Sequence, residues 1–359
     1  MKIAFVIESL SQGGSERQML RLAESLYKNG FDVCIIAYHD NEFYQIDNQL
    51  EKCVRVIETP SRVRRVLSIT KELKNYRPDV VISYIQYSSM YALVSTLGMP
   101  RCKHIISWRS YSPQFLNKKF IRILDLFNKR VSAIVCNSRH GYRLWKERRP
   151  KDINKLHVIF NLFADLKTDD EYKYSNDKPK RIIVPARFAK VKNPDKLVQA
   201  YSRLSSEERA SLRIDWFGSD GNDKEYCDKV RNDIIQNDLS EYIHVYPASK
   251  QIYSEIARAD IVGLFSESEG FPNAICEGMI LGKTVLMTKV SDYADLVSDN
   301  GYCCESTVDG IEVGLKWAAS LTYNELNAMG NRSKLKAEEM FNYSKELQKW
   351  TLLFQQSQE

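Results

Sequence analysis

The sequence predicts an α/β protein built from two doubly wound, Rossmann-like domains. Its 359 residues exceed the ~250 at which a single hydrophobic core stops growing, so two domains are expected. Short apolar, β-branched segments alternate with amphipathic segments along the chain. This alternation is typical of parallel sheets covered by helices on both faces. A polar, strongly charged stretch at 161–180 separates two such sets, and we place the linker at 166–180.

The N-terminal domain is expected over residues 1–165. Its first strand is followed by a Gly-Gly loop and by apolar residues at helical spacing, which Gly30 ends. The predicted strands are 2–7, 32–37, 80–83, 105–108, 133–136 and 157–160.

The C-terminal domain is expected over residues 181–339. We predict strands at 181–185, 213–217, 243–246, 261–265 and 284–287, with helices near 194–204, 223–237, 250–258 and 272–281. The C-terminal segment from about 309 to 356 is predicted to be entirely helical. Since ligands of such sheets bind outside the carboxyl ends of the strands, we expect the site in a cleft between the domains.

Composition excludes several classes of protein. Hydrophobic residues at 43% and charged residues at 27% are ordinary globular values, not those of a disordered or collagen-like chain. No apolar run approaches the ~18 residues of a membrane-spanning helix, and the first eight residues do not read as a signal peptide. We therefore expect a cytoplasmic protein. The eight cysteines and five histidines lack metal-binding spacings, which predicts reduced thiols and no protein-bound metal.

The charge is unevenly distributed. Residues 1–165 hold 27 Lys and Arg against 15 Asp and Glu, net +12, whereas residues 166–359 hold 25 against 31, net −6. The stretch 60–151 alone has 20 basic and 4 acidic side chains, net +16. Such a face suits nucleic acid, an anionic membrane surface or a phosphorylated substrate. A merely solvated basic face is the alternative.

Two motifs could hold phosphate. Gly13 and Gly14 stand between a strand and a helix, where glycine lets the backbone approach a phosphate, although a tight turn explains them as well. The spacing is not that of a dinucleotide-binding loop, so a nicotinamide enzyme is disfavoured. Arg187 and Lys192 follow a strand and are placed to hold a diphosphate, or are ordinary surface charges.

The segment 266–279 is the most specific indication of a ligand-binding site. Glu269 lies in a glycine-containing loop after a strand, and Glu277 lies in the following helix, whose first turn suits Pro272. Each carboxylate can accept two hydroxyl hydrogen bonds, so the pair could grip a sugar and a ribose. Free N–H groups near 271–274 would add donors. Two structural glutamates in caps or salt bridges are the alternative.

Taken together, the motifs resemble the retaining family 4 glycosyltransferases of the GT-B fold. The similarity runs from residue 3 to about residue 300. It rests on the ordered set Gly13-Gly14-Ser15-Glu16, Cys136-Asn137-Ser138, Val158-Ile159-Phe160-Asn161, Ala186-Arg187 with Lys192-Asn193, Phe217-Gly218-Ser219-Asp220-Gly221, and Glu269-Gly270-Phe271-Pro272 with Glu277.

The resemblance implies a donor site. Gly14 would present its N–H to the donor, Arg187 and Lys192 would hold the nucleotide diphosphate, Glu269 would bind the transferred sugar, and Glu277 the ribose hydroxyls. The implied substrate-binding set is Gly13, Gly14, Ser15, Asn137, Asn161, Gly218, Phe271, Pro272, Asn273, Ala274 and Glu277. In that fold the last helix, here about 340–359, packs back on the N-terminal domain.

Arg109 stands where related enzymes often carry histidine. An arginine stays protonated, so it cannot act as a general base, and any catalytic role would be electrostatic. We expect it to contact a phosphate of the donor or acceptor; an arginine paired with an acidic side chain for structure is the alternative.

The implied reaction needs no cofactor and no metal. The partners would be a nucleotide-diphosphate-sugar, a saccharide or polyprenyl-diphosphate-linked acceptor, and the anionic inner face of the plasma membrane. The run 269–274 is similar to that of enzymes that use uridine-diphosphate-sugars, so the resemblance implies that the nucleotide is uridine. Nucleic-acid binding ranks lower because no recognition module is visible. The rival functions are a nucleotide-sugar epimerase of the same shape and a non-catalytic glycosyltransferase-like subunit.

Overall fold

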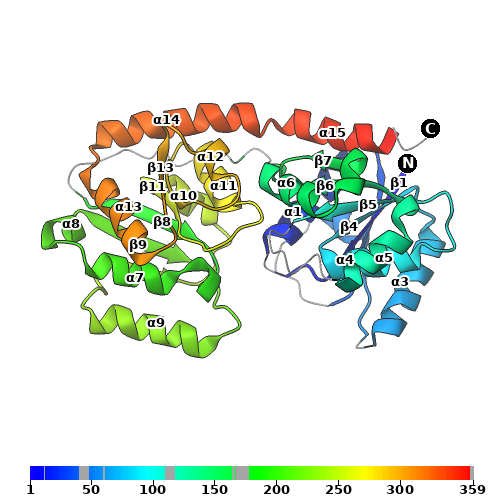
Figure 1. Cartoon of the computed structure of the whole chain (residues 1–359), viewed down its shortest axis with the longest axis horizontal. Coiled ribbons are helices and arrows are strands. Elements are labelled where there is room, and N and C mark those ends of the chain that lie inside the picture. The colour runs from blue at the N-terminus through cyan, green and yellow to red at the C-terminus, as the bar shows by residue number, and fades with distance from the viewer. Residues whose placement is uncertain are drawn as a thin grey trace. The chain divides into compact units, whose positions relative to one another are not determined.

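The computed structural model describes residues 1–11, 13–39, 48–59, 61–109, 118–163, 166 and 178–355. The expected linker lies almost wholly outside these residues. The chain forms two compact units (Figure 1): unit 1 comprises Met1–Ala164 and Tyr343–Glu359, and unit 2 comprises Asp165–Asn342. Within the described residues, no helix is long and apolar enough to cross a membrane.

Unit 1 contains a seven-stranded parallel sheet in the order β3-β2-β1-β4-β5-β6-β7. Its strands are β1 (Lys2–Ile7), β2 (Asp32–Ala37), β3 (Val54–Val56), β4 (Val80–Tyr84), β5 (Lys103–Trp108), β6 (Val131–Cys136) and β7 (Leu156–Val158). The strand β3 was not predicted, because it is three residues long, lies at the sheet edge and exposes two of its side chains. The predicted strand at 157–160 is also displaced, since β7 ends at Val158.

Helices cover both faces of this sheet. They are α1 (Gly14–Lys28), α2 (Asn48–Glu51), α3 (Arg62–Tyr76), α4 (Gln86–Ser95), α5 (Lys118–Leu126), α6 (Arg139–Arg148) and α15 (Tyr343–Gln355). Successive side chains of a strand point to opposite faces. Accordingly Phe5 joins the core under α1 and α15, whereas Val6 joins the core under α3 and α4.

The C-terminal helix α15 is part of the unit 1 core. Its Trp350, Leu353 and Phe354 are buried against α1 and the sheet. Its buried Glu346 accepts a hydrogen bond from the Phe160 N–H at 2.8 Å. The last helix therefore completes the domain that the first residues of the chain begin.

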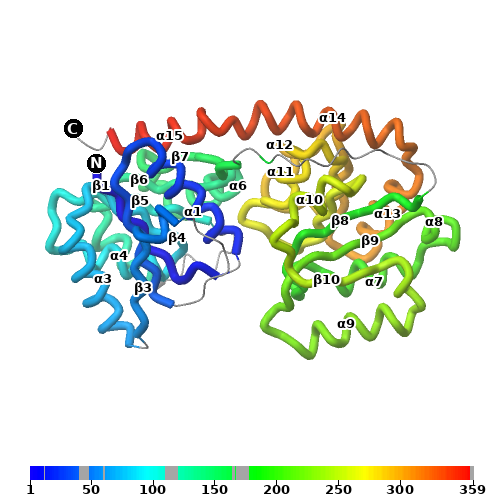
Figure 2. The backbone as a smooth tube through the Cα atoms, turned by 180° about the vertical axis from the view of Figure 1, so that it is seen from behind, coloured from blue at the N-terminus to red at the C-terminus, as the bar shows by residue number. Residues whose placement is uncertain are grey.

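Unit 2 contains a six-stranded parallel sheet in the order β10-β9-β8-β11-β12-β13. Its strands are β8 (Lys180–Pro185), β9 (Leu212–Phe217), β10 (Ile243–Tyr246), β11 (Ile261–Leu264), β12 (Thr284–Thr288) and β13 (Gly301–Cys304). Figure 2 shows β8, β9 and β10 side by side in that order. The edge strand β13 was not predicted, since it begins with a glycine and is only half-buried.

The helices of unit 2 are α7 (Pro194–Ser202), α8 (Ser206–Ala210), α9 (Lys224–Gln236), α10 (Ile252–Ala257), α11 (Asn273–Ile280), α12 (Tyr293–Leu296), α13 (Val308–Ser320) and α14 (Tyr323–Met340). The predicted helical tail is thus three helices, α13, α14 and α15. One group, α7, α9 and α13, packs together; α10, α11 and α14 form another (Figure 1).

One glycine lets α11 pack closely on the sheet. A Cβ on Gly278 would lie 2.4 Å from Cγ1 of Val262 in β11, far inside contact distance. Only glycine fits this close approach of helix and strand. The packing fixes the position of α11, and with it the side chain of Glu277 next to Gly278.

Candidate active site

The strand order of unit 2 identifies where its loops diverge. The connections run outward in opposite directions from β8 and β11, which are neighbours in the sheet. Such a switch point creates a crevice at the carboxyl ends of the two strands, where ligands of open α/β sheets bind. The loop after β8 carries Arg187 and Lys192, and the loop after β11 carries Glu269.

Lys192 and Glu269 form an ion pair across this switch point. The Lys192 ammonium donates to Oε1 of Glu269, and both side chains are mostly buried, 21% and 12% exposed. The Ser266 hydroxyl donates to the same oxygen at 2.6 Å. Asn193, which adopts a left-handed conformation at the start of α7, donates from its side chain to the Phe265 carbonyl at 2.8 Å. These contacts fix the loop after β8 and the loop after β11 relative to each other.

Arg187 is placed differently from Lys192. Its side chain is exposed and makes no hydrogen bond or ion pair with any described residue. The backbone around it is fixed, because the Phe188 N–H donates to the Ser219 carbonyl at 2.9 Å. A Cβ on Gly218 would lie 2.0 Å from the Ala186 oxygen, so glycine is required where these two loops meet. A firmly held loop therefore presents a guanidinium that has no partner among the described residues.

Glu277 is a buried carboxylate on α11, with a side chain 1% exposed. Its Oε1 accepts a hydrogen bond from the Tyr253 hydroxyl at 3.3 Å. Burial raises the pKa of the adjacent Cys276 thiol well above its ordinary value, and the Glu277 carboxylate adds to this effect. The thiol therefore stays protonated. Tyr253 was not singled out from the sequence, since nothing local links it to a residue 24 positions away.

The start of α11 offers fewer free donors than expected. Pro272 is the N-cap residue, and the Asn273 N–H already donates to the Phe271 carbonyl at 3.0 Å. The N–H of Ala274 has no partner among the described residues. The expectation of a run of free amides at 271–274 was therefore wrong for Asn273. The buried ring of Phe271 packs edge-on against Phe341 and supports the turn.

Arg109 lies at the carboxyl end of β5 among neutral partners. Its Nε donates to the Ser107 hydroxyl at 2.8 Å, Nη1 to the Asn161 side-chain oxygen, and Nη2 to the Tyr84 hydroxyl at 3.4 Å. Its guanidinium also lies 5.1 Å from the centre of the Tyr84 ring. No acidic side chain pairs with it in the described part of the chain. Within the described residues, the structure thus gives no support to the alternative of an arginine paired with an acid.

The positive charge of Arg109 affects its surroundings. Burial raises the pKa of the Tyr84 hydroxyl, and Arg109 opposes that shift. Burial likewise raises the pKa of the Cys136 thiol to about 12, again against Arg109. Both neighbours remain neutral at physiological pH. The guanidinium is thus a half-buried cation without a counter-ion in the described residues, which is the electrostatic setting of an anion site.

The remaining unit 1 residues lie at the same sheet edge. The expected Gly-Gly loop is shorter than predicted: Gly13 is the N-cap residue, and Gly14 and Ser15 already belong to the first turn of α1. Their amides precede the first intrahelical bond, from the Arg17 N–H to the Gly13 carbonyl. Asn137 follows β6, is mostly buried, and makes no side-chain hydrogen bond to the described residues.

Three polar residues of the site escaped the sequence analysis: Ser266, Tyr253 and Tyr84. The sequence could have indicated Ser266, because this residue follows a predicted strand directly and lies three positions before Glu269. No sequence feature indicated the two tyrosines, because tertiary packing alone brings them next to their partners. Among the described residues, no group of three or more His, Cys, Asp or Glu could hold a metal ion.

Two family descriptions together match nearly the whole chain. Residues 12–163 match the family described as Glycosyltransferase Family 4, and residues 167–336 match the family described as Glycosyl transferases group 1. The first match ends at residue 163 and the second begins at residue 167, close to the start of the linker expected at 166–180.

Two relatives in sequence and one in structure extend this result. The chain is 25% identical over 330 residues to the GalNAc-alpha-(1->4)-GalNAc-alpha-(1->3)-diNAcBac-PP-undecaprenol alpha-1,4-N-acetyl-D-galactosaminyltransferase of Campylobacter jejuni, with 88% of this chain and 85% of the relative covered. It is 26% identical to an uncharacterized glycosyltransferase of Haemophilus influenzae, with 97% and 98% covered. The crystal structure of Anabaena HepE with UDP and glucose superposes with a TM-score of 0.83 at 17% identity, with 99% and 100% covered.

Proposed function

Because the chain belongs to the family 4 glycosyltransferases of the GT-B fold, we propose that it is a retaining enzyme using a uridine-diphosphate-sugar. The acceptor that we propose is a saccharide or a polyprenyl-diphosphate-linked saccharide of surface polysaccharide or glycolipid assembly. The site residues predicted from the sequence supply the parts that this reaction needs.

One observation carries the proposal: the Lys192–Glu269 ion pair at the switch point of unit 2. A cation and a carboxylate held side by side match the two halves of a nucleotide-sugar, a diphosphate and a sugar ring rich in hydroxyls. The ammonium has three donors and Glu269 has a second oxygen, so both can bind substrate without separating. Arg187, which is exposed and has no partner in the described part of the chain, adds a second cation for the diphosphate.

Two further residues would contact the sugar donor, Ala274 and the buried Glu277. Glu277 would accept hydrogen bonds from the ribose hydroxyls, with Tyr253 holding its other side. The Ala274 N–H would donate to a sugar hydroxyl. Two relatives support the substrate classes: HepE has been crystallised with UDP and glucose, and the name of the Campylobacter enzyme specifies an undecaprenyl-diphosphate-linked acceptor.

In the proposed reaction, the bond between the anomeric carbon and the diphosphate oxygen breaks. The acceptor hydroxyl oxygen forms a bond to that carbon on the same face, and its proton passes to the departing diphosphate. No side-chain base is required. Arg187 and Lys192 stabilise the negative charge that develops on the leaving group, which is commonly the largest catalytic contribution. Arg109 would stabilise a phosphate of the donor or acceptor.

The experiment that tests this function measures sugar transfer by mass spectrometry of the acceptor. Lys192→Ala should lower kcat/KM by ~100-fold or more, because the leaving charge loses its partner. Glu277→Gln should mainly raise the KM for the donor. Lys190→Ala, two residues from Lys192 and exposed, is the matched control and should leave turnover unchanged. A wild-type kcat/KM in Lys192→Ala together with a wild-type donor KM in Glu277→Gln would refute the donor site.

A further inference from the structure

Helix α3 of unit 1, which lies beside α4 (Figure 1), carries exposed aliphatic side chains on its outer side. Its inner side, formed by Arg65, Ile69 and Leu73, is buried. On the opposite side, Val63 and Leu67 are 70% and 63% exposed. Residues four positions apart share a helix face, so these two form one apolar strip. No other helix in the described part of the chain has two large apolar side chains more than 60% exposed.

The outer side of α3 is also strongly positive. Its four exposed cations are Arg62, Arg64, Lys71 and Lys74. None of their side chains forms a hydrogen bond or an ion pair with a described residue. The one acidic residue of the helix, Glu72, is only partly exposed. The same helix face therefore combines aliphatic surface with positive charge that nothing in the described residues neutralises.

Two of these cations stand where the helix itself disfavours them. Arg62 and Arg64 belong to the first turn of α3, which contains no acidic residue. The N-terminus of a helix carries a partial positive charge, so cations in the first turn are repelled. An anionic partner outside the protein would offset this repulsion.

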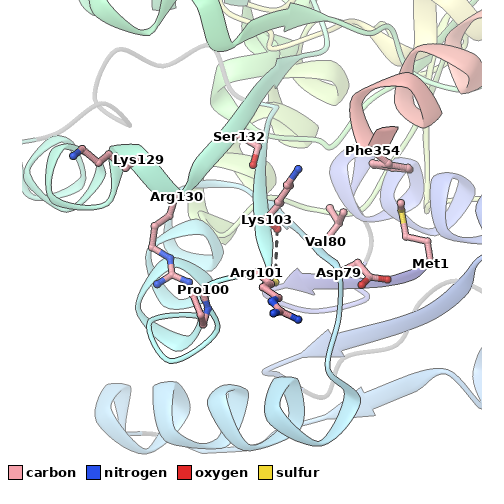
Figure 3. A pocket seen from close by; sticks show the side chains of 11 residues that line it. Met1, Asp79, Val80, Pro100, Arg101, Lys103, Lys129, Arg130, Ser132 and Phe354 are labelled. Atoms are coloured by element: carbon pink, nitrogen blue, oxygen red, sulfur yellow. Dashed lines mark hydrogen bonds between the residues drawn. The ribbon is translucent and has the colours of Figure 1, made fainter. Parts of the chain in front are cut away.

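The charges elsewhere in the basic stretch 60–151 do not converge on a small ligand. At the amino-terminal edge of the unit 1 sheet, a cavity is lined by Arg101, Lys103 and Lys129. Figure 3 shows that these three side chains point in different directions. Charges that are spread in this way favour an extended anionic surface over one small anion.

The combination of cations and aliphatic side chains favours a membrane over other extended partners. Nucleic acid offers phosphates to the cations, but its backbone has no apolar layer for Val63 and Leu67. A second copy of the chain fits poorly, because a two-fold contact would place the four cations of α3 against the same four cations. The surface of an anionic bilayer matches both features: head groups attract the cations, and the acyl boundary just below them accepts aliphatic side chains.

We propose that α3 is the membrane anchor of this protein. Val63 and Leu67 enter the boundary between head groups and acyl chains, and the four exposed cations of α3 contact anionic head groups. Since α3 follows β3, its first turns lie toward the carboxyl edge of the sheet, the edge where Arg109 follows β5. Docking through α3 would bring this edge near a membrane-held acceptor. This role in catalysis rests on the proposed function, whereas binding of α3 to a bilayer does not.

Cosedimentation of the full chain with vesicles tests the anchor without donor or acceptor. With vesicles of phosphatidylglycerol and phosphatidylcholine, Val63→Ser/Leu67→Ser should need at least about tenfold more lipid for half-maximal binding, because the membrane no longer buries two aliphatic side chains. Its salt dependence should equal that of the wild type, since all cations remain. Vesicles of phosphatidylcholine alone should bind neither protein.

The matched control removes aliphatic side chains of similar exposure from unit 2. Ile235→Ser/Leu335→Ser changes positions on α9 and α14 that are 63% and 67% exposed. This variant should bind vesicles as the wild type does. Unchanged thermal midpoints would show that both double variants fold.

Two further variants separate the apolar contact from the charges. Leu67→Trp should tighten vesicle binding several-fold, because tryptophan favours the membrane interface. Arg62→Gln/Arg64→Gln should instead weaken the salt dependence of binding, because two cations no longer meet head groups.

Equal vesicle binding by wild type and Val63→Ser/Leu67→Ser would overturn the anchor, and so would an equal loss in the control variant. Binding of a random-sequence DNA duplex without binding of anionic vesicles would also overturn it and assign the face to nucleic acid. The rise in thermal midpoint caused by uridine diphosphate reports the donor site in the same proteins. A missing rise with intact vesicle binding counts against the proposed function alone.

Discussion

At the scale of single residues, the candidate site of this glycosyltransferase depends on charges held by partners that are far away in the sequence. Lys192 meets Glu269 across 77 positions, and Arg109 is held by Tyr84 from β4 and by Asn161 from the segment after β7. Each of these groups is oriented before substrate arrives. Oriented charges need little reorganisation during the reaction, which is what makes them effective.

Arg109 gives the first prediction. Arg109→Ala should lose most of the transfer activity, whereas Arg109→Lys should keep part of it, because lysine retains the charge but not the planar fork. The wild-type pH–rate profile should show no loss near pH ~6.5 that depends on this position. The measurement is kcat/KM for the acceptor across pH 5 to 8. Full activity of Arg109→Ala with unchanged acceptor affinity would contradict the phosphate contact.

His104 gives a second prediction, about stability. It is fully buried in β5, where its Nε2 lies 2.7 Å from the Ser83 hydroxyl oxygen, and burial lowers its pKa to about 3. An unfolded histidine has a pKa of about 6.5. Between these values the unfolded chain binds the extra proton. The free energy of unfolding should therefore fall as the pH falls below 6.5, by up to about 1.4 kcal/mol per pH unit from this residue.

The test compares urea unfolding at pH 7 and pH 5, followed by tryptophan fluorescence. His104→Gln can still hydrogen-bond Ser83 but does not titrate, so its loss of stability between the two pH values should be smaller. His157→Gln is the control, since His157 is only half-buried and its pKa is lowered less. An identical pH dependence in wild type and His104→Gln would show that the buried imidazole is not responsible.

At the scale of elements, α11 brings residues of the proposed donor site to the sheet. Its close packing on β11 places Glu277 inside the unit and the Ala274 amide at the carboxyl edge. The contact needs the missing side chain of Gly278. A helix only eight residues long makes few contacts of its own, so its position depends on this packing.

Gly278→Ala should therefore impair both stability and donor binding. The new Cβ would lie 2.4 Å from Val262, and relieving such a clash typically costs about 1–3 kcal/mol. We expect a lower thermal midpoint and a raised KM for the donor. Gly98→Ala, where the nearest atom is the flexible end of Lys74 at 3.8 Å, is the control. If Val262→Ala fails to restore any activity to Gly278→Ala, the clash is not the cause.

At the scale of the whole molecule, the two halves of the chain carry opposite net charge. Residues 1–165 have net charge +12 and residues 166–359 have −6. Such an asymmetry orients a protein in the field of a charged surface. On this basis we propose that the N-terminal half meets the anionic face of the membrane, where a polyprenyl-diphosphate acceptor would be anchored, as expected from the sequence.

This proposal predicts salt-sensitive binding to anionic vesicles. Each engaged Lys or Arg contributes roughly 1 kcal/mol, screened at high ionic strength. Reversing Lys118, Lys119 and Arg122 to Glu should release the protein in a cosedimentation assay. The matched control reverses the exposed lysines 224, 229 and 250 of unit 2 and should have little effect. Equal cosedimentation of wild type and the first variant at low salt would assign the basic face another role.

The sequence by itself determined the class of the fold, the family and most of the candidate residues. Strand and helix periods reflect the local geometry of the backbone, so β1, α7 and α11 could be located from apolar spacing alone. The motif around Glu269 and Glu277 is contiguous and could be recognised in the same way. The short edge strands β3 and β13 were missed because few of their side chains are buried, which leaves no pattern to detect.

Only the tertiary structure decided which of these residues meet. The pairing of Lys192 with Glu269, the hydrogen bond from Tyr253 to Glu277, and the neutral partners of Arg109 all join segments whose proximity depends on strand order. The cavity at the amino-terminal edge of the unit 1 sheet is likewise lined from separate segments, by residues 79–80, 100–103 and 129–130 among others. Charge and periodicity can be read along the chain, but contacts across a sheet arise from packing the whole domain, which no local pattern encodes.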